Sequence, residues 1–229
     1  MSTVCGYAAL RAAVDAEARA CGRDPHSVTL VGVAKRQPVE AVAQAIAAGL
    51  KDVAENYVQE ARLAFARLPP VRRHFVGHVQ TNKAKALVEL FDVVQSVDRL
   101  DAGLALAVAA ERAGRVLPVL IQLNVSAAER FGCPPSEGER LAEQLRAREA
   151  LRVDGVMAIG PLAADRRAIA EAFALAAKTF AQIGGSTLSM GMSGDWREAV
   201  RAGSTMLRIG TALFGERGPV LRSQRGGAQ

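Results

Sequence analysis

The stretch VTLVGVAK, residues 28–35, decides the fold class. It is a short apolar run, rich in β-branched residues, that ends in a lysine. Pro38 and a helical pattern over Val39–Ala48 follow it, and proline suits the first turn of a helix. A short buried strand followed at once by a helix is the unit of a parallel α/β fold, so this stretch predicts further βα units downstream.

The same alternation continues to about residue 214. The apolar runs that we interpret as strands are Thr29–Ala34, Asp52–Glu55, Arg73–Gly77, Val93–Ser96, Pro118–Asn124, Val153–Ile159, Thr187–Met190 and Met206–Gly210. An additional helix is predicted before the first strand, over Val4–Cys21. Another is predicted over Ser136–Ala150, where Ser136 and Glu139 have the spacing of a capping box.

Eight strand and helix pairs within about 190 residues favour a closed (β/α)8 barrel over an open doubly wound sheet. The Gly-rich fingerprint GxGxxG of an open dinucleotide-binding sheet does not follow the first strand. Polar residues recur where the predicted strands end, namely Lys35, Asn56, His78, Ser96, Asn124, Ser193 and Thr211. In a barrel they share one rim, where active sites lie. We predict one barrel over residues 1–217, and a flexible tail over residues 218–229.

Composition limits the classes of function. The 229 residues suffice for one large α/β domain, and the three cysteines, Cys5, Cys21 and Cys133, are too scattered for a disulfide framework or metal cluster. No apolar run reaches the ~18 residues of a membrane span, so we expect a cytoplasmic protein that does not bind a membrane. The net charge of +6 is interspersed with acidic residues, which argues against a nucleic-acid partner. The positive electrostatic potential that this net charge produces would favour a small ligand that carries a phosphate.

Lys35 is the first candidate for chemistry. It places an amine at the C-terminal mouth of an apolar strand, where partial desolvation favours the neutral form that attacks an aldehyde. Lys35 is therefore a candidate for Schiff-base formation. A surface lysine that begins a loop is the alternative.

The segment LRIGTALFG, residues 207–215, is the second candidate. Gly210 would let the backbone approach a ligand, Thr211 offers a hydroxyl and an amide, and a helix start attracts phosphate. Ser193 is the matching contribution from the preceding strand. Arg208 shares a strand face with Gly210, so it points either into the barrel mouth or into an ion pair at the rim. A turn is the alternative explanation for the glycine.

His78 and Asn56 offer hydrogen bonds at the ends of two neighbouring predicted strands. Neither belongs to a recognisable catalytic triad, and a lone histidine more often has a structural role, which is the alternative for His78. No spacing of His, Cys, Asp or Glu predicts a metal site.

Together these segments resemble the pyridoxal phosphate homeostasis protein family, whose barrel is similar to the N-terminal domain of alanine racemase. The match covers nearly the whole chain. The segments that carry it are LVGVAK at 30–35, ENYVQE at 55–60, HFVGHVQTNK at 74–83, SVD at 96–98, GVMAI at 155–159, LSMGMS at 188–193 and RIGT at 208–211.

The resemblance implies that the chain binds pyridoxal 5'-phosphate (PLP), with the internal aldimine on Lys35. It implies that Ser193, Gly210 and Thr211 hold the phosphate and that Asn56 and His78 line the ring. Arg208 would face the pyridine nitrogen and, because a guanidinium does not readily release a proton, would leave that nitrogen unprotonated.

The function that the resemblance implies is carriage or buffering of PLP, in vitamin B6 and amino-acid homeostasis, without turnover. The expected partners are PLP and PLP-dependent apoenzymes, and we expect a monomer. A PLP-dependent racemase is the alternative, although neither Tyr7 nor Tyr57 lies in a recognisable catalytic setting for the second base. The sequence departs from the family pattern at Ala34 and Arg36, at Ala54, and in a shortened segment after Asn124.

Overall fold

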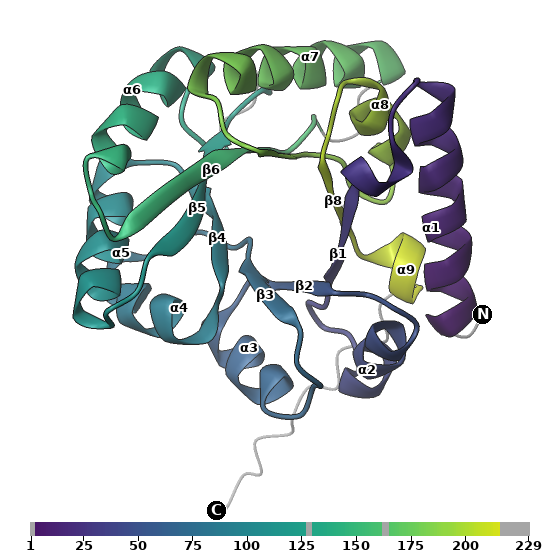
Figure 1. The fold of residues 1–229 in the computed structure, drawn as a ribbon, viewed down its shortest axis with the longest axis horizontal. Helices are drawn as coiled ribbons and strands as arrows, with labels where there is room; N and C mark the ends of the chain where they lie inside the picture. Colours follow the sequence, from purple (N-terminus) through teal and green to yellow (C-terminus); the bar gives the residue numbers. More distant parts are fainter. Residues whose placement is uncertain (1–2, 127–129, 162–164, 216–229) are drawn as a thin grey trace, which may run out of the picture.

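The computed structural model describes residues 3–126, 130–161 and 165–215, which form a closed barrel of eight parallel strands in the order of the chain (Figure 1). The strands are β1 (Thr29–Val33), β2 (Asp52–Glu55), β3 (Arg72–Phe75), β4 (Val93–Val97), β5 (Leu117–Leu123), β6 (Leu151–Ala158), β7 (Thr187–Ser189) and β8 (Met206–Ile209). β8 pairs with β1 and closes the barrel. The predicted fold class is confirmed, while the predicted tail at residues 218–229 lies outside the described residues.

Helices form the outer ring of the barrel (Figure 1). They are α1 (Thr3–Ala20), α2 (Val39–Ala47), α3 (Val58–Phe65), α4 (Ala84–Leu90), α5 (Leu100–Arg112), α6 (Pro135–Arg146), α7 (Arg166–Ile183), α8 (Trp196–Arg201) and α9 (Thr211–Phe214), with 3-10 turns η1 (Pro25–Ser27) and η2 (Thr81–Lys83). α1 is the predicted extra helix, and it packs against α2, α8 and α9. None of the helices in the described parts of the chain is long and apolar enough to cross a membrane.

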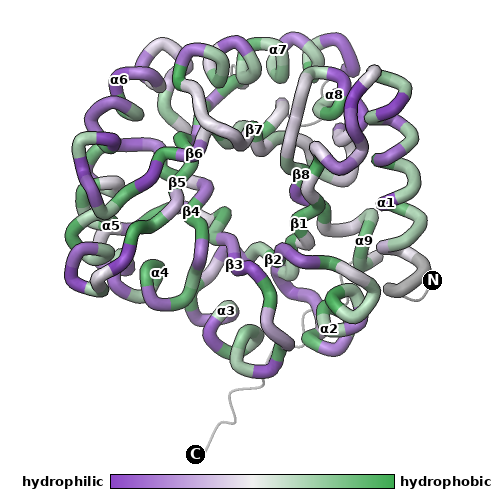
Figure 2. The backbone as a smooth tube through the Cα atoms, viewed as in Figure 1, coloured by the Kyte–Doolittle hydropathy of each residue, from purple (hydrophilic) through white to green (hydrophobic). Residues whose placement is uncertain are grey.

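The main core lies between the strands and the helices. Leu30 and Val53, on neighbouring strands, belong to this layer, whereas Val31, Ala54 and Met206 form a small separate cluster. Along α7, hydrophilic and hydrophobic residues alternate, as expected for a helix with one face on the barrel (Figure 2). The strands that carry the mouth of the barrel are therefore held in place by helices packed on their outer side.

The predicted capping box at Ser136 is wrong. α6 begins at Pro135, after Pro134, and no side chain caps its first turn. Proline is favoured in the first helical turn, so Pro135 starts the helix one residue early and places Ser136 inside that turn. The helix ends at Arg146 instead of Ala150.

A close backbone contact next to the mouth generates the first prediction. A Cβ added at Gly77 would lie 2.0 Å from the carbonyl oxygen of Asn56, which is a backbone atom that cannot move aside. We expect Gly77→Ala to lower the free energy of unfolding by about 1–3 kcal/mol, the cost of overpacking. Gly194→Ala, where an added Cβ would meet nothing within 4 Å, is the control and should change it far less. Urea denaturation of both variants measures this, and equal stabilities would contradict it.

Candidate functional site

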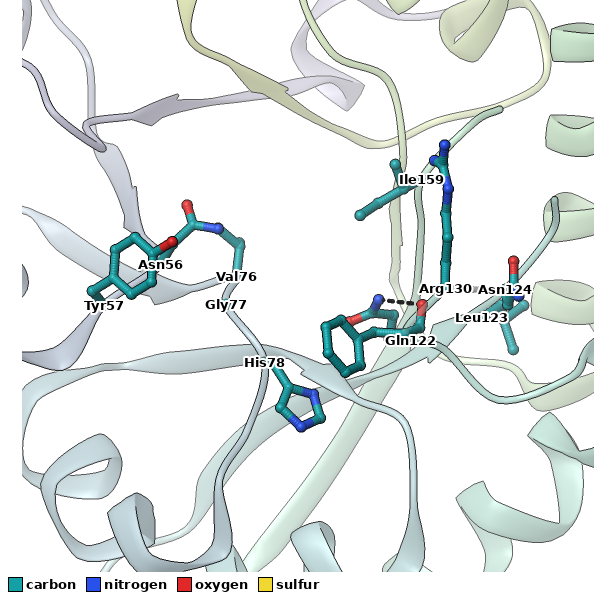
Figure 3. Close-up of a pocket in the computed structure, with 11 residues that line it drawn as sticks. Asn56, Tyr57, Val76, Gly77, His78, Gln122, Leu123, Asn124, Arg130 and Ile159 are labelled. Atoms are coloured by element: carbon teal, nitrogen blue, oxygen red, sulfur yellow. Dashed lines mark hydrogen bonds between the residues drawn. The ribbon is translucent and has the colours of Figure 1, made fainter. Parts of the chain in front are cut away.

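A cavity of about 800 Å³ opens at the C-terminal ends of the strands (Figure 3). Asn56 and Tyr57 face it from the end of β2, while Gln122 and Ile159 approach it from β5 and β6 (Figure 3). The complete lining is Asn56, Tyr57, Val76, Gly77, His78, Gln122, Leu123, Asn124, Arg130, Phe131 and Ile159. The wall is largely apolar with a few polar groups, as is usual for a small-molecule site.

Lys35 lies two residues beyond β1 and does not itself line this cavity, but it contacts Tyr57, which does. Its side chain is half-buried, and its Nζ lies 5.1 Å from the centroid of the Tyr57 ring, which lines the cavity. A cation over an aromatic face is stabilised by about 0.5–1 kcal/mol at an exposed site. Tyr57 was not predicted as a site residue from the sequence, although it adjoins Asn56 in the same motif.

Arg36 follows Lys35 in a left-handed backbone conformation, with φ of 59°. Residues other than glycine adopt this conformation rarely and at a cost of about 1–3 kcal/mol, and such residues cluster at functional sites. The turn that presents Lys35 to the mouth is therefore strained at the neighbouring residue.

The loop after β7 meets the start of α9 beside the end of β1, because β8 pairs with β1. Ser193 Oγ accepts a hydrogen bond of 3.1 Å from the backbone N–H of Ala212, in the first turn of α9. Gly210 directly precedes this helix, and a Cβ there would have only the carbonyl oxygen of Val33 nearby, at 3.9 Å. The space beside Gly210 is thus open, and Thr211 is exposed next to it. Together they offer a hydroxyl, backbone amides and room for a phosphate.

Arg208 lies inside the barrel and is 4% exposed. Its Nη1 donates to both the carbonyl oxygen and the Oγ of Ser189, at 2.8 Å each, and its Nη2 donates to the carbonyl oxygen of Ala158, also at 2.8 Å. Burial lowers the pKa of Arg208 to about 10, opposed by the charge of Asp195, so the side chain stays cationic at neutral pH. No ion pair among the described residues includes Arg208, which excludes the rim ion pair considered from the sequence.

His78 and Asn56 both line the cavity (Figure 3). The His78 ring stacks on Phe131 with centroids 4.0 Å apart, and its Nε2 lies 3.3 Å from Nη1 of Arg99. Its Nδ1 is buried and has no hydrogen-bond partner within the described part of the chain. Asn124, another predicted rim residue, also lines the cavity.

The placement of Ser96 at the rim was wrong. β4 continues to Val97, so Ser96 lies within the strand, is 1% exposed, and donates a hydrogen bond of 2.5 Å from its Oγ to the carbonyl oxygen of Gly77. Ser96 therefore holds the loop after β3 in place, and the cavity wall does not include it.

Glu55 is a second residue that the sequence analysis did not single out. It ends β2, is 2% exposed, and its Oε2 has no hydrogen-bond partner among the residues described. Burial, and to a lesser extent the nearby Glu60, raise the pKa of Glu55 to about 7, against the opposing effects of the Asn56 backbone N–H and the Lys35 charge. A carboxyl group beside the lysine thus changes its charge near neutral pH.

This raised pKa predicts a pH-dependent stability. The folded protein favours the protonated Glu55, so its contribution is present below the ordinary pKa of 4.5 and is lost as pH rises through about 7. Glu55→Gln has no carboxyl group to ionise, so it should not show this loss. At pH 8 its free energy of unfolding should be higher than that of the parent protein by up to about 3 kcal/mol. Denaturant unfolding between pH 5 and 8 measures it, with the exposed Glu40→Gln as control. Parallel profiles for Glu55→Gln and the parent would contradict the assignment.

Comparison with known proteins first places the barrel in a class. Residues 7–218 match the family described as alanine racemase, N-terminal domain. The solved alanine racemase of Streptomyces lavendulae superposes with a TM-score of 0.74 at 19% sequence identity, over 93% of this chain and 56% of that one. At this identity the likeness concerns the fold alone.

Within this class, the chain belongs to the family of pyridoxal phosphate homeostasis proteins. The protein of that name from Pseudomonas aeruginosa is 42% identical over 223 residues, which cover 95% of this chain and 97% of the relative. PipY of Synechococcus elongatus, solved with PLP bound, is 35% identical with a TM-score of 0.78, over 86% of this chain and 97% of that one. The family resemblance inferred from the sequence is confirmed.

Proposed function

We propose that this protein binds PLP at the mouth of its barrel and carries or buffers the cofactor through a Schiff base to Lys35. The observation that carries the proposal is the half-buried Lys35 amine, which lies over the ring of Tyr57, a residue that lines the cavity. PLP supplies an aldehyde, and an amine in a partly desolvated site is the group that reacts with it. The PLP-bound structure of PipY supports the same ligand for this chain.

The other rim residues fit the remaining parts of PLP. Ser193, Gly210 and Thr211 surround open space at the start of α9 and would bind the phosphate. α9 has only four residues, so hydroxyl and backbone groups contribute more to this binding than a helix dipole. Asn56 and His78 would line the ring.

Arg208 would donate to the pyridine nitrogen. A guanidinium has five N–H groups, and three hydrogen bonds to Ser189 and Ala158 leave two that no described residue accepts. Burial lowers the pKa of Arg208 only to about 10, so the side chain keeps its protons at neutral pH. A pyridine nitrogen that remains unprotonated is a weak electron sink, which favours holding the cofactor over amino-acid chemistry.

Two observations favour carriage of PLP over racemisation of amino acids, namely the family to which the chain belongs and the positions of its two tyrosines. The curated relative from Pseudomonas aeruginosa is named a homeostasis protein. Tyr7 donates its hydroxyl hydrogen to the carbonyl oxygen of Gly49, at 3.0 Å, and lies in the outer helix α1. Tyr57 presents its ring face to the Lys35 amine. Neither hydroxyl thus has the setting of a second base.

The same proposal includes the context of the protein. We infer that it acts as a cytoplasmic monomer that delivers PLP to PLP-dependent apoenzymes. In the described residues, the exposed large apolar side chains are spread over different elements, including Leu63 on α3, Val108 on α5 and Leu175 on α7, which favours a monomer. Cys21 and Cys133 are free thiols, as in a reducing compartment. Light scattering tests the inferred monomer, and reconstitution of a PLP-dependent apoenzyme by the PLP-loaded protein tests the inferred delivery.

The direct test of the proposed function is spectroscopic. Purified protein with added PLP should show a band at about 420 nm, and borohydride reduction followed by peptide mapping should place the adduct on Lys35. Lys35→Ala should lose both the band and the adduct. Lys85→Ala removes an exposed lysine of α4 and should keep them. An adduct spread over surface lysines, or a band that survives Lys35→Ala, would overturn the assignment.

Racemisation assays separate carriage from catalysis. We expect the PLP-loaded protein to racemise alanine and other amino acids no faster than free PLP at the same concentration. Turnover well above that of free PLP, and lost in Lys35→Ala, would identify an enzyme instead.

A further inference from the structure

A continuous chain of side-chain hydrogen bonds crosses the barrel interior and ends on Arg208. His74 Nε2 lies 2.9 Å from Asp52 Oδ1, and His74 Nδ1 lies 2.9 Å from Gln95 Nε2. Ser189 Oγ donates to Gln95 Oε1 at 2.6 Å and accepts from Arg208 Nη1 at 2.8 Å. We call Asp52, His74, Gln95 and Ser189 the interior relay. They come from β2, β3, β4 and β7, and each is at most 8% exposed.

The direction of the bonds in the relay follows from Arg208, which can only donate, and agrees with the position of Met206. The Met206 sulfur, which can only accept, lies 3.2 Å from Gln95 Nε2, so the amide nitrogen of Gln95 faces His74 and its oxygen faces Ser189. His74 Nδ1 therefore accepts from Gln95, and its Nε2–H donates to Asp52. From Arg208 to Asp52 all donors point the same way, and aligned hydrogen bonds polarise and strengthen one another.

The relay has a charged group at each end. Arg208 is cationic and, although Asp195 acts on it electrostatically, forms no ion pair within the described residues. At the other end, Asp52 supplies a carboxylate. Asp52 begins β2 and lines a separate polar pocket at the opposite end of the barrel, with Arg11 and His26. The relay thus links the guanidinium beneath the mouth to a carboxylate at the far end.

We propose that the interior relay positions Arg208, so that its remaining N–H groups meet the pyridine nitrogen of the cofactor in a fixed orientation. This inference rests on the proposed binding of PLP. The four relay residues act through Arg208, so they are positioning residues. A buried polar network of this kind holds its members in one arrangement only when every link is satisfied.

Ser189→Ala tests the link next to Arg208. The variant keeps the Ser189 carbonyl that also accepts from Arg208, so the guanidinium loses one of its three hydrogen bonds. With PLP labelled with ¹⁵N in the ring, we expect the ¹⁵N resonance of the bound cofactor to move from that of the parent. PLP affinity should fall by up to about tenfold, because a displaced guanidinium makes a weaker hydrogen bond to the pyridine nitrogen.

Ser204→Ala is the matched control. Ser204 is also fully buried, and its Oγ is hydrogen-bonded to the carbonyl oxygens of Leu188, Met190 and Met206, outside the relay. It should lower stability but leave the ¹⁵N resonance unchanged. A relay that is merely structural would make the two variants behave alike.

Asp52→Asn tests the far end with little change of shape. The amide oxygen can still accept from His74, but the negative charge is gone, so we expect the ¹⁵N resonance to move in the same direction as in Ser189→Ala. Unchanged resonances in both relay variants, with PLP still attached to Lys35, would overturn the relay and leave the proposed function standing. Failure of the parent protein to attach PLP to Lys35 would overturn the proposed function itself.

Discussion

The parallel pairing of β8 with β1 closes the barrel, and the candidate site depends on it. The register places Arg208 opposite Val31 and Ile209 opposite Gly32. The end of β1, two residues before Lys35, thereby lies beside Gly210, where an added Cβ would be 3.9 Å from the carbonyl oxygen of Val33, although Gly210 and Lys35 are about 175 residues apart in the chain. The lysine and the phosphate-binding segment come from the first and last strands, so neither half of the protein contains the site alone.

The second constraint is the charge held inside this barrel. The interior of a (β/α)8 barrel is usually filled with layers of branched apolar side chains, but here β2, β3, β4, β7 and β8 contribute polar or charged ones. A buried cation costs several kcal/mol unless it is hydrogen-bonded, and neutral acceptors on Ser189 and Ala158 meet part of that cost for Arg208. The protein gives up stability to hold one guanidinium in place beneath the mouth, which fits the proposed contact of Arg208 with the ring nitrogen of PLP.

Much of the fold followed from the sequence because strand and helix periodicities are local. The eight strands were predicted with small errors at their ends, and the strand-end rule placed Asn56, His78 and Asn124 at the cavity correctly. It failed for Ser96, because one further residue of β4 moves that side chain into the wall. The capping box failed because the two prolines before Ser136 start the helix early.

What the sequence could not provide were interactions between distant strands. Nothing local shows that His74, Gln95 and Ser189 share hydrogen bonds, since this depends on the register of several strands around the barrel. The same holds for Glu55, whose pKa of about 7 results from burial, and for Tyr57, whose ring meets Lys35 only because β1 and β2 are adjacent.

A crystal structure of the protein grown with PLP tests the central claim most directly. The account predicts continuous electron density from the Lys35 Nζ to the aldehyde carbon of PLP, with the phosphate at Ser193, Gly210 and Thr211 and the ring nitrogen at Arg208. PLP attached to another lysine, or bound at the mouth with its phosphate away from the start of α9, would contradict it.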